Sequence, residues 1–156
     1  MPNVELEDVF RTHQRAVFSY FYRVCGNYHQ AEELTQETFV RACAAAVRYR
    51  GDGPIAHWLF AIARRVLMQA SRRGLFEHPR ELDQNLPAPE VDHGDRMDLE
   101  RGFALLETID REALVLVDLL GFPPAEAAEI TGIEGGAFRM RLHRARRRLR
   151  DLLEER

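Results

Sequence analysis

Seven arginines crowd one short stretch near the end of the chain, and arginine is well suited to binding phosphate groups. No acidic residue lies between positions 135 and 150. Guanidinium groups at this density repel one another unless a polyanion neutralises them. The stretch therefore predicts binding of a nucleic-acid backbone, with a solvated basic surface as the alternative. Its arginines are Arg139, Arg141, Arg144, Arg146, Arg147, Arg148 and Arg150.

The residues between and before these arginines predict two helices that would position them. Apolar side chains recur every three or four residues from Phe138 to Leu152, which is one face of a helix. A shorter helix is expected to begin at Pro124, because a proline suits a first helical turn. Gly132 stands where the chain must turn between the two helices. Two helices joined by such a short turn form a helix-turn-helix, whose second helix can enter the DNA major groove.

The rest of the chain also reads as helical, so the expected fold class is all-α. Apolar periodicity predicts helices over about 4–24, 28–50, 55–73, 99–108 and 111–120, with Asp110 as the N-cap of the last. Residues 74–98 carry Pro79, Pro87, Pro89 and Gly94 with little periodicity, and they are too numerous for a connection inside one compact domain. We therefore expect two small helical domains, 1–73 and 99–156, joined by a flexible linker at 74–98.

Charge is distributed unevenly along the chain, although the 156 residues together carry a net charge of only −3. Residues 1–73 hold 10 arginines and 7 acidic residues, whereas the linker at 74–98 holds 2 arginines and 7 acidic residues. Residues 99–156 hold 10 arginines and 11 acidic residues, with the arginines gathered at the end. Two basic helical modules on an acidic linker predict a protein that engages one long anionic partner at two places.

No pattern in the chain points to catalysis. A glycine-rich phosphate loop, a nucleophile elbow and a His-Glu zinc motif are all missing, and the six histidines are scattered. We expect neither an enzyme nor a cofactor. Cys25 and Cys43 fall in apolar helical patterns and are expected to be buried reduced thiols, with a redox pair as the alternative. The chain shows no signal segment and no apolar run near 18 residues, which predicts a cytoplasmic protein that does not insert into a membrane.

Three motifs resemble those of an extracytoplasmic-function, or group IV, bacterial sigma factor of the sigma-70 family. HQAEELTQETFVRA at 29–42 is similar to the polymerase-binding helix of that family. IAHWLFAIARRVLMQASRR at 55–73 is similar to its helix for the minus-10 promoter element. AEAAEITGIEGGAFRMRLHRARRRLR at 125–150 is similar to its minus-35 helix-turn-helix. The order of the motifs and the two-domain layout also match.

The resemblance implies partners and residue roles. Core RNA polymerase would be bound through Glu33, Gln36 and Glu37, which would contact the clamp helices of its largest subunit. The 50–54 loop would receive a base flipped out of the promoter strand, and the acidic linker would enter the RNA exit channel. The minus-35 duplex would meet Gly136, Arg139, Arg141 and Arg144. Minus-10 DNA would meet Arg50, Asp52, Trp58, Arg64, Arg65, Gln69, Arg72 and Arg73.

Some positions depart from the family pattern, and two alternatives stay open. Arg65 and Gln69 stand where the family often has Asn and Asp, and Met140 lacks the hydroxyl that is common at its position. One alternative is a stand-alone helix-turn-helix regulator, which would need a dimer to span two half-sites. The other is a sigma-like interaction module that has lost DNA binding. We expect a monomer when the chain is free of partners. With no further domain after Arg156, we expect regulation from outside, by an anti-sigma factor.

Overall fold

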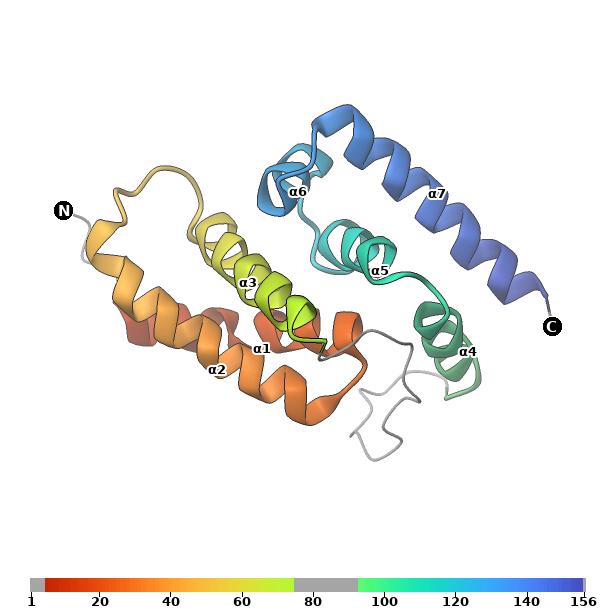
Figure 1. Cartoon of the computed structure of the whole chain (residues 1–156), viewed down its shortest axis with the longest axis horizontal. Coiled ribbons are helices and arrows are strands. Elements are labelled where there is room, and N and C mark those ends of the chain that lie inside the picture. Colours follow the sequence, from red (N-terminus) through yellow and green to blue (C-terminus); the bar gives the residue numbers. More distant parts are fainter. Residues whose placement is uncertain (1–4, 75–92, 156) are drawn as a thin grey trace.

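The computed structural model describes residues 5–74 and 93–155, with side chains from residue 98 onward in the second range. Within these ranges the chain forms seven α-helices and no strand, so the all-α prediction is confirmed (Figure 1). The first bundle consists of α1 (Leu6–Cys25), α2 (Tyr28–Ala45) and α3 (Ile55–Arg72). The second bundle consists of α4 (His93–Ala104), α5 (Thr108–Leu114), α6 (Pro124–Thr131) and α7 (Gly135–Glu154). Most of the predicted linker lies outside the described residues.

The first bundle is built around the apolar faces of its three helices. A two-residue turn folds α2 back along α1, and the Asn27 side chain caps α2 by accepting a hydrogen bond from the Gln30 amide at 2.9 Å. Tyr20 of α1 and Phe60 of α3 meet edge to face, with ring centroids 5.6 Å apart. Both side chains are fully buried, so the aromatic residues of α1 form the core that holds α3 in place.

The second bundle carries the predicted helix-turn-helix, formed by α6 and α7. Pro124 lies in the first turn of α6, as expected. The helix ends at Gly132, whose φ of 70° is a left-handed conformation that glycine adopts without strain. Helix α7 starts three residues later and buries Phe138, Leu142 and Ala145. The turn is therefore short enough to hold the two helices as one unit.

Helix α5 differs from the prediction in both its start and its end. The extended backbone at Glu107 (φ −65°, ψ 151°) places the first turn at Thr108, so Asp110 lies inside the helix and is not its N-cap. After Leu114 the chain continues into a single π-helical turn, η2 (Val115–Leu119), in which the Leu120 amide donates to the Val115 carbonyl at 2.9 Å. The prediction of a regular helix from 111 to 120 is therefore wrong in detail.

The two bundles pack directly against each other. Helix α3 contacts α6, and α1 contacts α5, as Figure 1 also shows for α3 and α6. Phe60 of α3 and Phe122, just before α6, have ring centroids 5.1 Å apart. The buried apolar residues of both bundles form one cluster. The predicted linker implied two domains, but their mutual placement could only come from the structure.

The two cysteines occupy different environments. Cys25 is buried, as predicted, whereas Cys43 is exposed, so the prediction is wrong for Cys43. Helix α2 buries a narrow stripe that ends at Ala42, and Cys43 follows it by about 100° around the helix. None of the described helices is long and apolar enough to cross a membrane. In the same described ranges, no three His, Cys, Asp or Glu side chains are grouped so that they would hold a metal ion.

Candidate nucleic-acid interface

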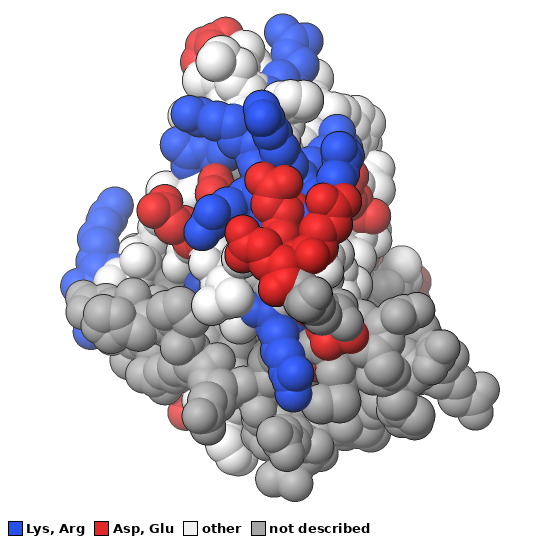
Figure 2. Space-filling model, turned by 90° about the vertical axis from the view of Figure 1, so that its right-hand side faces the viewer, with Lys and Arg blue, Asp and Glu red and all other residues white. Residues whose placement is uncertain are grey.

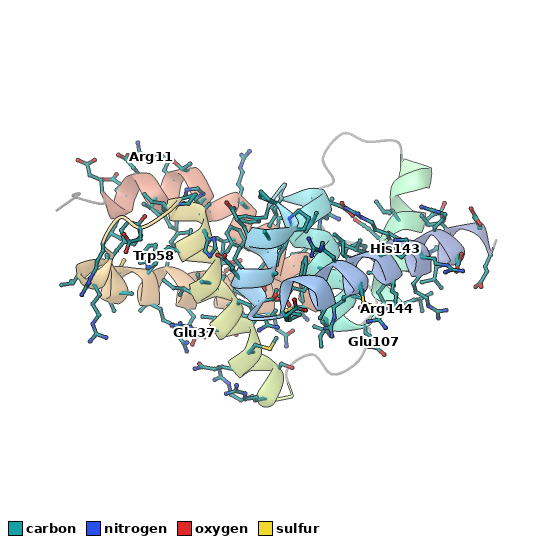
Figure 3. The ribbon with its side chains drawn as sticks, turned by 90° about the horizontal axis from the view of Figure 1, so that it is seen from above. Arg11, Glu37, Trp58, Glu107, His143 and Arg144 are labelled. Atoms are coloured by element: carbon teal, nitrogen blue, oxygen red, sulfur yellow. The ribbon has the colours of Figure 1, made fainter. Side chains whose placement is uncertain are left out.

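The rotation of α7 decides which of its side chains point away from the protein. Each residue advances about 100° around a helix, so the buried Phe138 and Leu142 define the inner face. Met140, which is 64% exposed, lies on the opposite face together with His143 and Arg147. Figure 3 shows His143 and Arg144 on this helix. The predicted minus-35 residues did not include Met140, His143 or Arg147, because they followed the family motif and not the rotation of the helix.

The three predicted minus-35 arginines do not share one face of α7. Arg139 and Arg144 are exposed, but Arg141 is only partly so, and it lies on the flank of the helix opposite to Arg139. Arg141 and Arg144 line a groove of about 640 Å³ between α5 and α7, together with Arg147 and Arg148. Figure 2 shows basic and acidic side chains side by side on the end of the molecule that holds α4 and the end of α7. The arginine surface is thus wider than one helix face.

Acidic residues reduce the positive charge of this surface. Asp110 lies in the groove, where burial and the nearby Glu107 raise its pKa, while Arg141 and Arg144 act in the opposite direction. Asp118 accepts two hydrogen bonds from Arg146, at 3.0 Å from Nε and 2.6 Å from Nη2, and this pairing raises the pKa of Arg146. Among the seven clustered arginines, all of which the structure describes, Arg146 is the one with an ion pair.

The start of α7 is already occupied by a carboxylate. The amides of Gly136 and Ala137 each donate to the Glu134 side chain at 2.9 Å, which lowers the pKa of Glu134. A Cβ added at Gly136 would lie 3.2 Å from Glu134 Oε2, so glycine leaves room for this cap. Backbone amides at the start of a helix, left open by glycine, are a common binding site for phosphate. In the structure the approaching anion is Glu134, which a phosphate would have to displace.

Helix α3 presents most of its predicted DNA-binding side chains on one exposed stripe. Arg65, Gln69, Arg72 and Arg73 are all exposed, and their spacing places them within about 100° of one another around the helix. Gln69 accepts a hydrogen bond from Arg41 of α2. The structure therefore brings these four residues together next to α2.

Arg64 is the exception, because it points to the second bundle. Its side chain is only 17% exposed, and its Nε lies 2.9 Å and 3.2 Å from the two carboxylate oxygens of Glu112. Its Nη1 donates to the Thr131 carbonyl at 3.0 Å. Tyr20 donates its hydroxyl to the same carboxylate, and burial followed by the charge of Glu112 raises the pKa of Tyr20 well above its ordinary value. We refer to Tyr20, Arg64, Glu112 and Thr131 as the Glu112 network.

The loop before α3 is shaped by an aromatic pair. Tyr49 packs on Trp58 with ring centroids 4.9 Å apart, and its hydroxyl donates to the Gly53 carbonyl at 2.9 Å. Arg50 and Asp52 are exposed on this loop, whereas Trp58 is partly buried (Figure 3). Sequence reasoning named Trp58 but missed Tyr49, which ties the loop to the helix.

The predicted polymerase-binding residues lie on the outer side of α2. Glu33 and Gln36 are exposed, and Glu37 is partly buried (Figure 3). Arg41 bonds to Glu37 at 2.6 Å and also donates to Gln69 of α3. One arginine therefore joins the predicted polymerase surface to the predicted minus-10 surface. Its spacing of four residues from Glu37 was a visible sequence signal. The exposed side continues with Val40, which is 68% exposed, and α2 is followed by a single 3-10 turn, η1 (Ala46–Arg48), whose Val47 is 80% exposed.

Two known families match this chain. Residues 9–74 match Sigma-70 region 2, which covers nearly the whole first bundle. Residues 96–149 match Sigma-70, region 4, which covers most of the second bundle. The two matches thus divide the chain at the segment that we predicted to be a linker.

Curated relatives agree with these matches. The ECF RNA polymerase sigma factor SigE of Mycolicibacterium smegmatis is 33% identical over 157 aligned residues, which cover 94% of this chain and 61% of SigE. The RNA polymerase sigma factor CarQ of Myxococcus xanthus is 32% identical over 155 residues, which cover 96% of this chain and 89% of CarQ. The ECF RNA polymerase sigma factor SigC of Mycobacterium tuberculosis is 40% identical over 126 residues, 74% of this chain and 66% of SigC. The chain spans less than two thirds of the length of SigE and of SigC.

Solved structures share the fold. The sigma factor RpoE, in complex with the anti-sigma factor NepR from Bartonella quintana, superimposes with a TM-score of 0.82 at 24% identity over 96% of both chains. CnrH, in complex with the cytosolic domain of CnrY, superimposes with a TM-score of 0.71 at 24% identity, over 96% of this chain and 87% of CnrH. At this level of identity, the likeness establishes the arrangement of the helices.

Proposed function

Because the chain belongs to the extracytoplasmic-function sigma factors of the sigma-70 family, we propose that it binds core RNA polymerase and directs it to promoters. Such promoters carry a minus-10 and a minus-35 element, and the two bundles address one element each. The protein selects the start site and assists in melting the DNA, while the polymerase performs the chemistry. Proteins of this family are in general initiation factors without catalytic activity of their own.

One observation carries the proposal furthest, namely the bridge that Arg41 makes between α2 and α3. It binds Glu37 on one side and Gln69 on the other. A surface for polymerase and a surface for minus-10 DNA must adjoin if DNA is to be melted on the polymerase. A stand-alone helix-turn-helix regulator has no use for the acidic side of α2 or for its connection to α3.

The first bundle provides the proposed minus-10 surface. Arg65, Arg72 and Arg73 would bind phosphates, and Gln69 would reach a base edge. The loop at 50–54, held by the Tyr49 hydroxyl, would receive a flipped base beside Trp58. Unstacking a base costs a few kcal/mol. Because the 50–54 loop is already ordered, ordering this loop adds little to the cost of binding the flipped base.

The second bundle provides the proposed minus-35 surface. To the predicted Gly136, Arg139, Arg141 and Arg144 we add the outward-facing side chains of Met140, His143 and Arg147. The side chains nearest the start of α7 would reach base edges, and those nearer its end would lie on phosphates. Each phosphate contact steepens the dependence of binding on salt.

We further propose an anti-sigma factor as a partner and the cytoplasm as the place of action. Two sigma factors of the same fold are found in complexes, RpoE with the anti-sigma factor NepR and CnrH with the cytosolic domain of CnrY.

We propose the cytoplasm because RNA polymerase, which the chain must bind, acts there. Val40 of α2 and Val47, in the short turn that follows it, are the apolar part of the surface that polymerase would cover.

The proposal is tested by reversing charge on α2. We expect Glu33→Lys together with Glu37→Lys to weaken binding to purified core polymerase at least about tenfold, because the clamp contact would lose two carboxylates. The matched control is Glu7→Lys together with Asp8→Lys on α1, two exposed acidic residues in the first turn of that helix, of which Glu7 also pairs with an arginine four residues away. Binding is measured by pull-down and by transcription from a cognate promoter. Equal binding by both variants would contradict the proposal and favour the stand-alone regulator.

A further inference from the structure

The outward face of α7 changes in chemistry along the helix. Because each residue advances about 100° around a helix, Gly136 and Ala137 lie within about 60° of Met140 on this face. None of the three side chains carries a hydrogen-bond donor, and the thioether sulfur of Met140 is only a weak acceptor. Farther from the helix start, the same face carries His143, Arg144 and Arg147. On this face the start of α7 is therefore an apolar edge, and positive charge follows only in the later turns.

Met140 is the one long side chain of this apolar edge. It is 64% exposed and is not part of the apolar cluster in the core, whereas the same helix buries Phe138 and Leu142. A side chain on a helix leans toward the N-terminus, over the residues three and four positions earlier. For Met140 these residues are Ala137 and Gly136, which have no atom beyond Cβ. A molecule that approaches the start of α7 from outside would therefore meet Met140 before any other long side chain of this face.

The DNA major groove offers few partners to such an edge. The second helix of a helix-turn-helix contacts base edges chiefly with residues near its start. In the major groove every base pair presents hydrogen-bond donors and acceptors, and the C5 methyl group of thymine is the one apolar group among them. An apolar side chain placed against a donor or acceptor would remove water from it without replacing the hydrogen bond. Against the methyl group, it would instead bury apolar surface of both partners.

We propose that Met140 contacts the C5 methyl group of a thymine in the minus-35 element and thereby makes the chain select an A·T pair at that position. This inference rests on the proposed function, and it specifies what one residue of the minus-35 surface reads. The methionine side chain is unbranched and polarisable, so it can follow the exact position of the methyl group. Arg144 and Arg147 lie farther from the helix start and would hold phosphates while Met140 reads the base.

The test removes the methyl group from the DNA and the methionine from the protein in one experiment. Holoenzyme assembled from core polymerase and the full chain first selects a promoter from a pool of random-sequence DNA. Each thymine of the selected minus-35 element, on either strand, is then replaced in turn by deoxyuridine. Deoxyuridine lacks only the C5 methyl group and pairs with adenine in the same way. Fluorescence anisotropy measures the affinity of the holoenzyme for each labelled duplex.

The wild type is compared with three variants. Met140→Ala removes the apolar side chain, and Met140→Leu keeps one of similar size. The control is Leu119→Ala, which truncates an apolar side chain of the second bundle that is 46% exposed and lies outside α7. Circular dichroism reports the folding of each variant. A role of Met140 in folding alone would not change how the holoenzyme distinguishes thymine from deoxyuridine.

We expect deoxyuridine at one position to weaken binding of the wild type about fourfold, which is the effect of leaving about one methyl group unburied. Met140→Ala should bind both duplexes with the lower affinity, so that the difference between them disappears. Met140→Leu should retain most of the difference, and Leu119→Ala all of it. A duplex with 5-methylcytosine at this position should bind the wild type more tightly than one with cytosine, because the methyl group returns without the thymine.

Three results would overturn the inference. One is a wild type that binds thymine and deoxyuridine equally at every position, and another is a folded Met140→Ala that keeps the wild-type preference. The third is a selected minus-35 element without thymine on either strand. Each of these leaves the proposed function intact, because the holoenzyme still selects a promoter. If the wild-type holoenzyme selected no promoter and gave no specific transcript, the proposed function would be rejected and this inference with it.

Discussion

The arginines of α3 and α7 have the same chemistry and very different surroundings. Arg64 of α3 is 17% exposed and bonds to a carboxylate and a carbonyl of the other bundle. Arg147 of α7 is exposed on the outward face of its helix. Both stand in motifs that predict DNA binding. The difference teaches that residue type selects candidates, while the neighbouring helices decide which candidates can reach DNA.

The positions of the two helices explain this difference. Helix α3 lies between its own bundle and α6, so only one stripe of it reaches solvent (Figure 1). Helix α7 lies at the edge of the molecule and packs along one face, chiefly on α4, α5 and α6. An arginine on α3 therefore meets a neighbouring helix more often than an arginine on α7 does.

The largest expected effect comes from removing the buried arginine. Arg64→Ala leaves the Glu112 carboxylate buried without its cation, and we expect the folded protein to lose about 3–5 kcal/mol of stability. The matched variant on α7, Arg147→Ala, should change the free energy of unfolding by less than about 0.5 kcal/mol. Urea unfolding followed by circular dichroism measures both.

The variant on α7 should instead change the dependence of DNA binding on salt. We expect Arg147→Ala to lower the slope of log affinity against log salt by about one, because one phosphate contact is lost. If Arg147→Ala destabilised the fold as much as Arg64→Ala, the contrast between the two helices would be wrong.

A smaller effect is expected at alkaline pH, through Tyr20. Burial and the charge of Glu112 raise its pKa above the ordinary value of 10.0, with Arg64 acting in the opposite direction and Cys25 in the same one. A raised pKa means that the folded protein binds this proton more tightly than the unfolded chain does. Its contribution is complete below pH 10 and is lost as the pH rises through the raised value, by up to about 1.4 kcal/mol per pH unit.

The variant Tyr20→Phe isolates this contribution, because the other three tyrosines are unchanged. We expect the wild type to lose stability as the pH rises above 10, and Tyr20→Phe to lack that part of the pH dependence. Urea unfolding at a series of pH values provides the measurement. Identical pH profiles for the two proteins would show that Tyr20 does not hold its proton for the Glu112 network.

The smallest effect is expected at the exposed start of α7. The amides of Gly136 and Ala137 lower the pKa of Glu134, so this cap stabilises α7 above the ordinary pKa of 4.5 and is lost as the pH falls through the lowered value. Glu134→Gln should weaken the helix start and remove this dependence on pH.

The same variant should also strengthen DNA binding, by about two- to fivefold, because one negative charge leaves the surface that would face phosphates. Thermal unfolding at pH 3–6 and fluorescence anisotropy with a labelled duplex of mixed sequence measure the two effects. Glu154→Gln, at the exposed far end of the same helix, is the control. A loss of DNA affinity in Glu134→Gln would mean that the cap orders the DNA-binding residues more than it repels DNA.

Local patterns predicted the elements of the fold well where one turn or one helix face decides the outcome. Pro124 and Gly132 bound α6 as expected, and apolar spacing marked the inner face of α7. The same reasoning failed at α5, where Asp110 has the right type for an N-cap but the backbone bends earlier, at Glu107. It also failed at Cys43, since a pattern that looks apolar does not reveal how narrow the buried stripe of α2 is.

Within the candidate sites, the sequence identified surfaces more reliably than individual contacts. Arg65, Gln69, Arg72 and Arg73 share an exposed stripe, as their spacing requires. Arg41 was missed, although it connects two of the predicted surfaces, because the partner Gln69 lies 28 residues away. A role that depends on a distant partner leaves no trace in local spacing.

The sequence by itself determined the helices, the helix-turn-helix and the concentration of positive charge, because helical periodicity and turn chemistry act over a few residues. Only the tertiary structure decided which of those charges are available. Arg64 and Arg65 are neighbours in the chain, yet one binds Glu112, 48 residues away, and the other faces solvent. Tyr20 reaches the same carboxylate across 92 residues. Burial of a charge depends on such distant partners, and these are set by how the bundles pack.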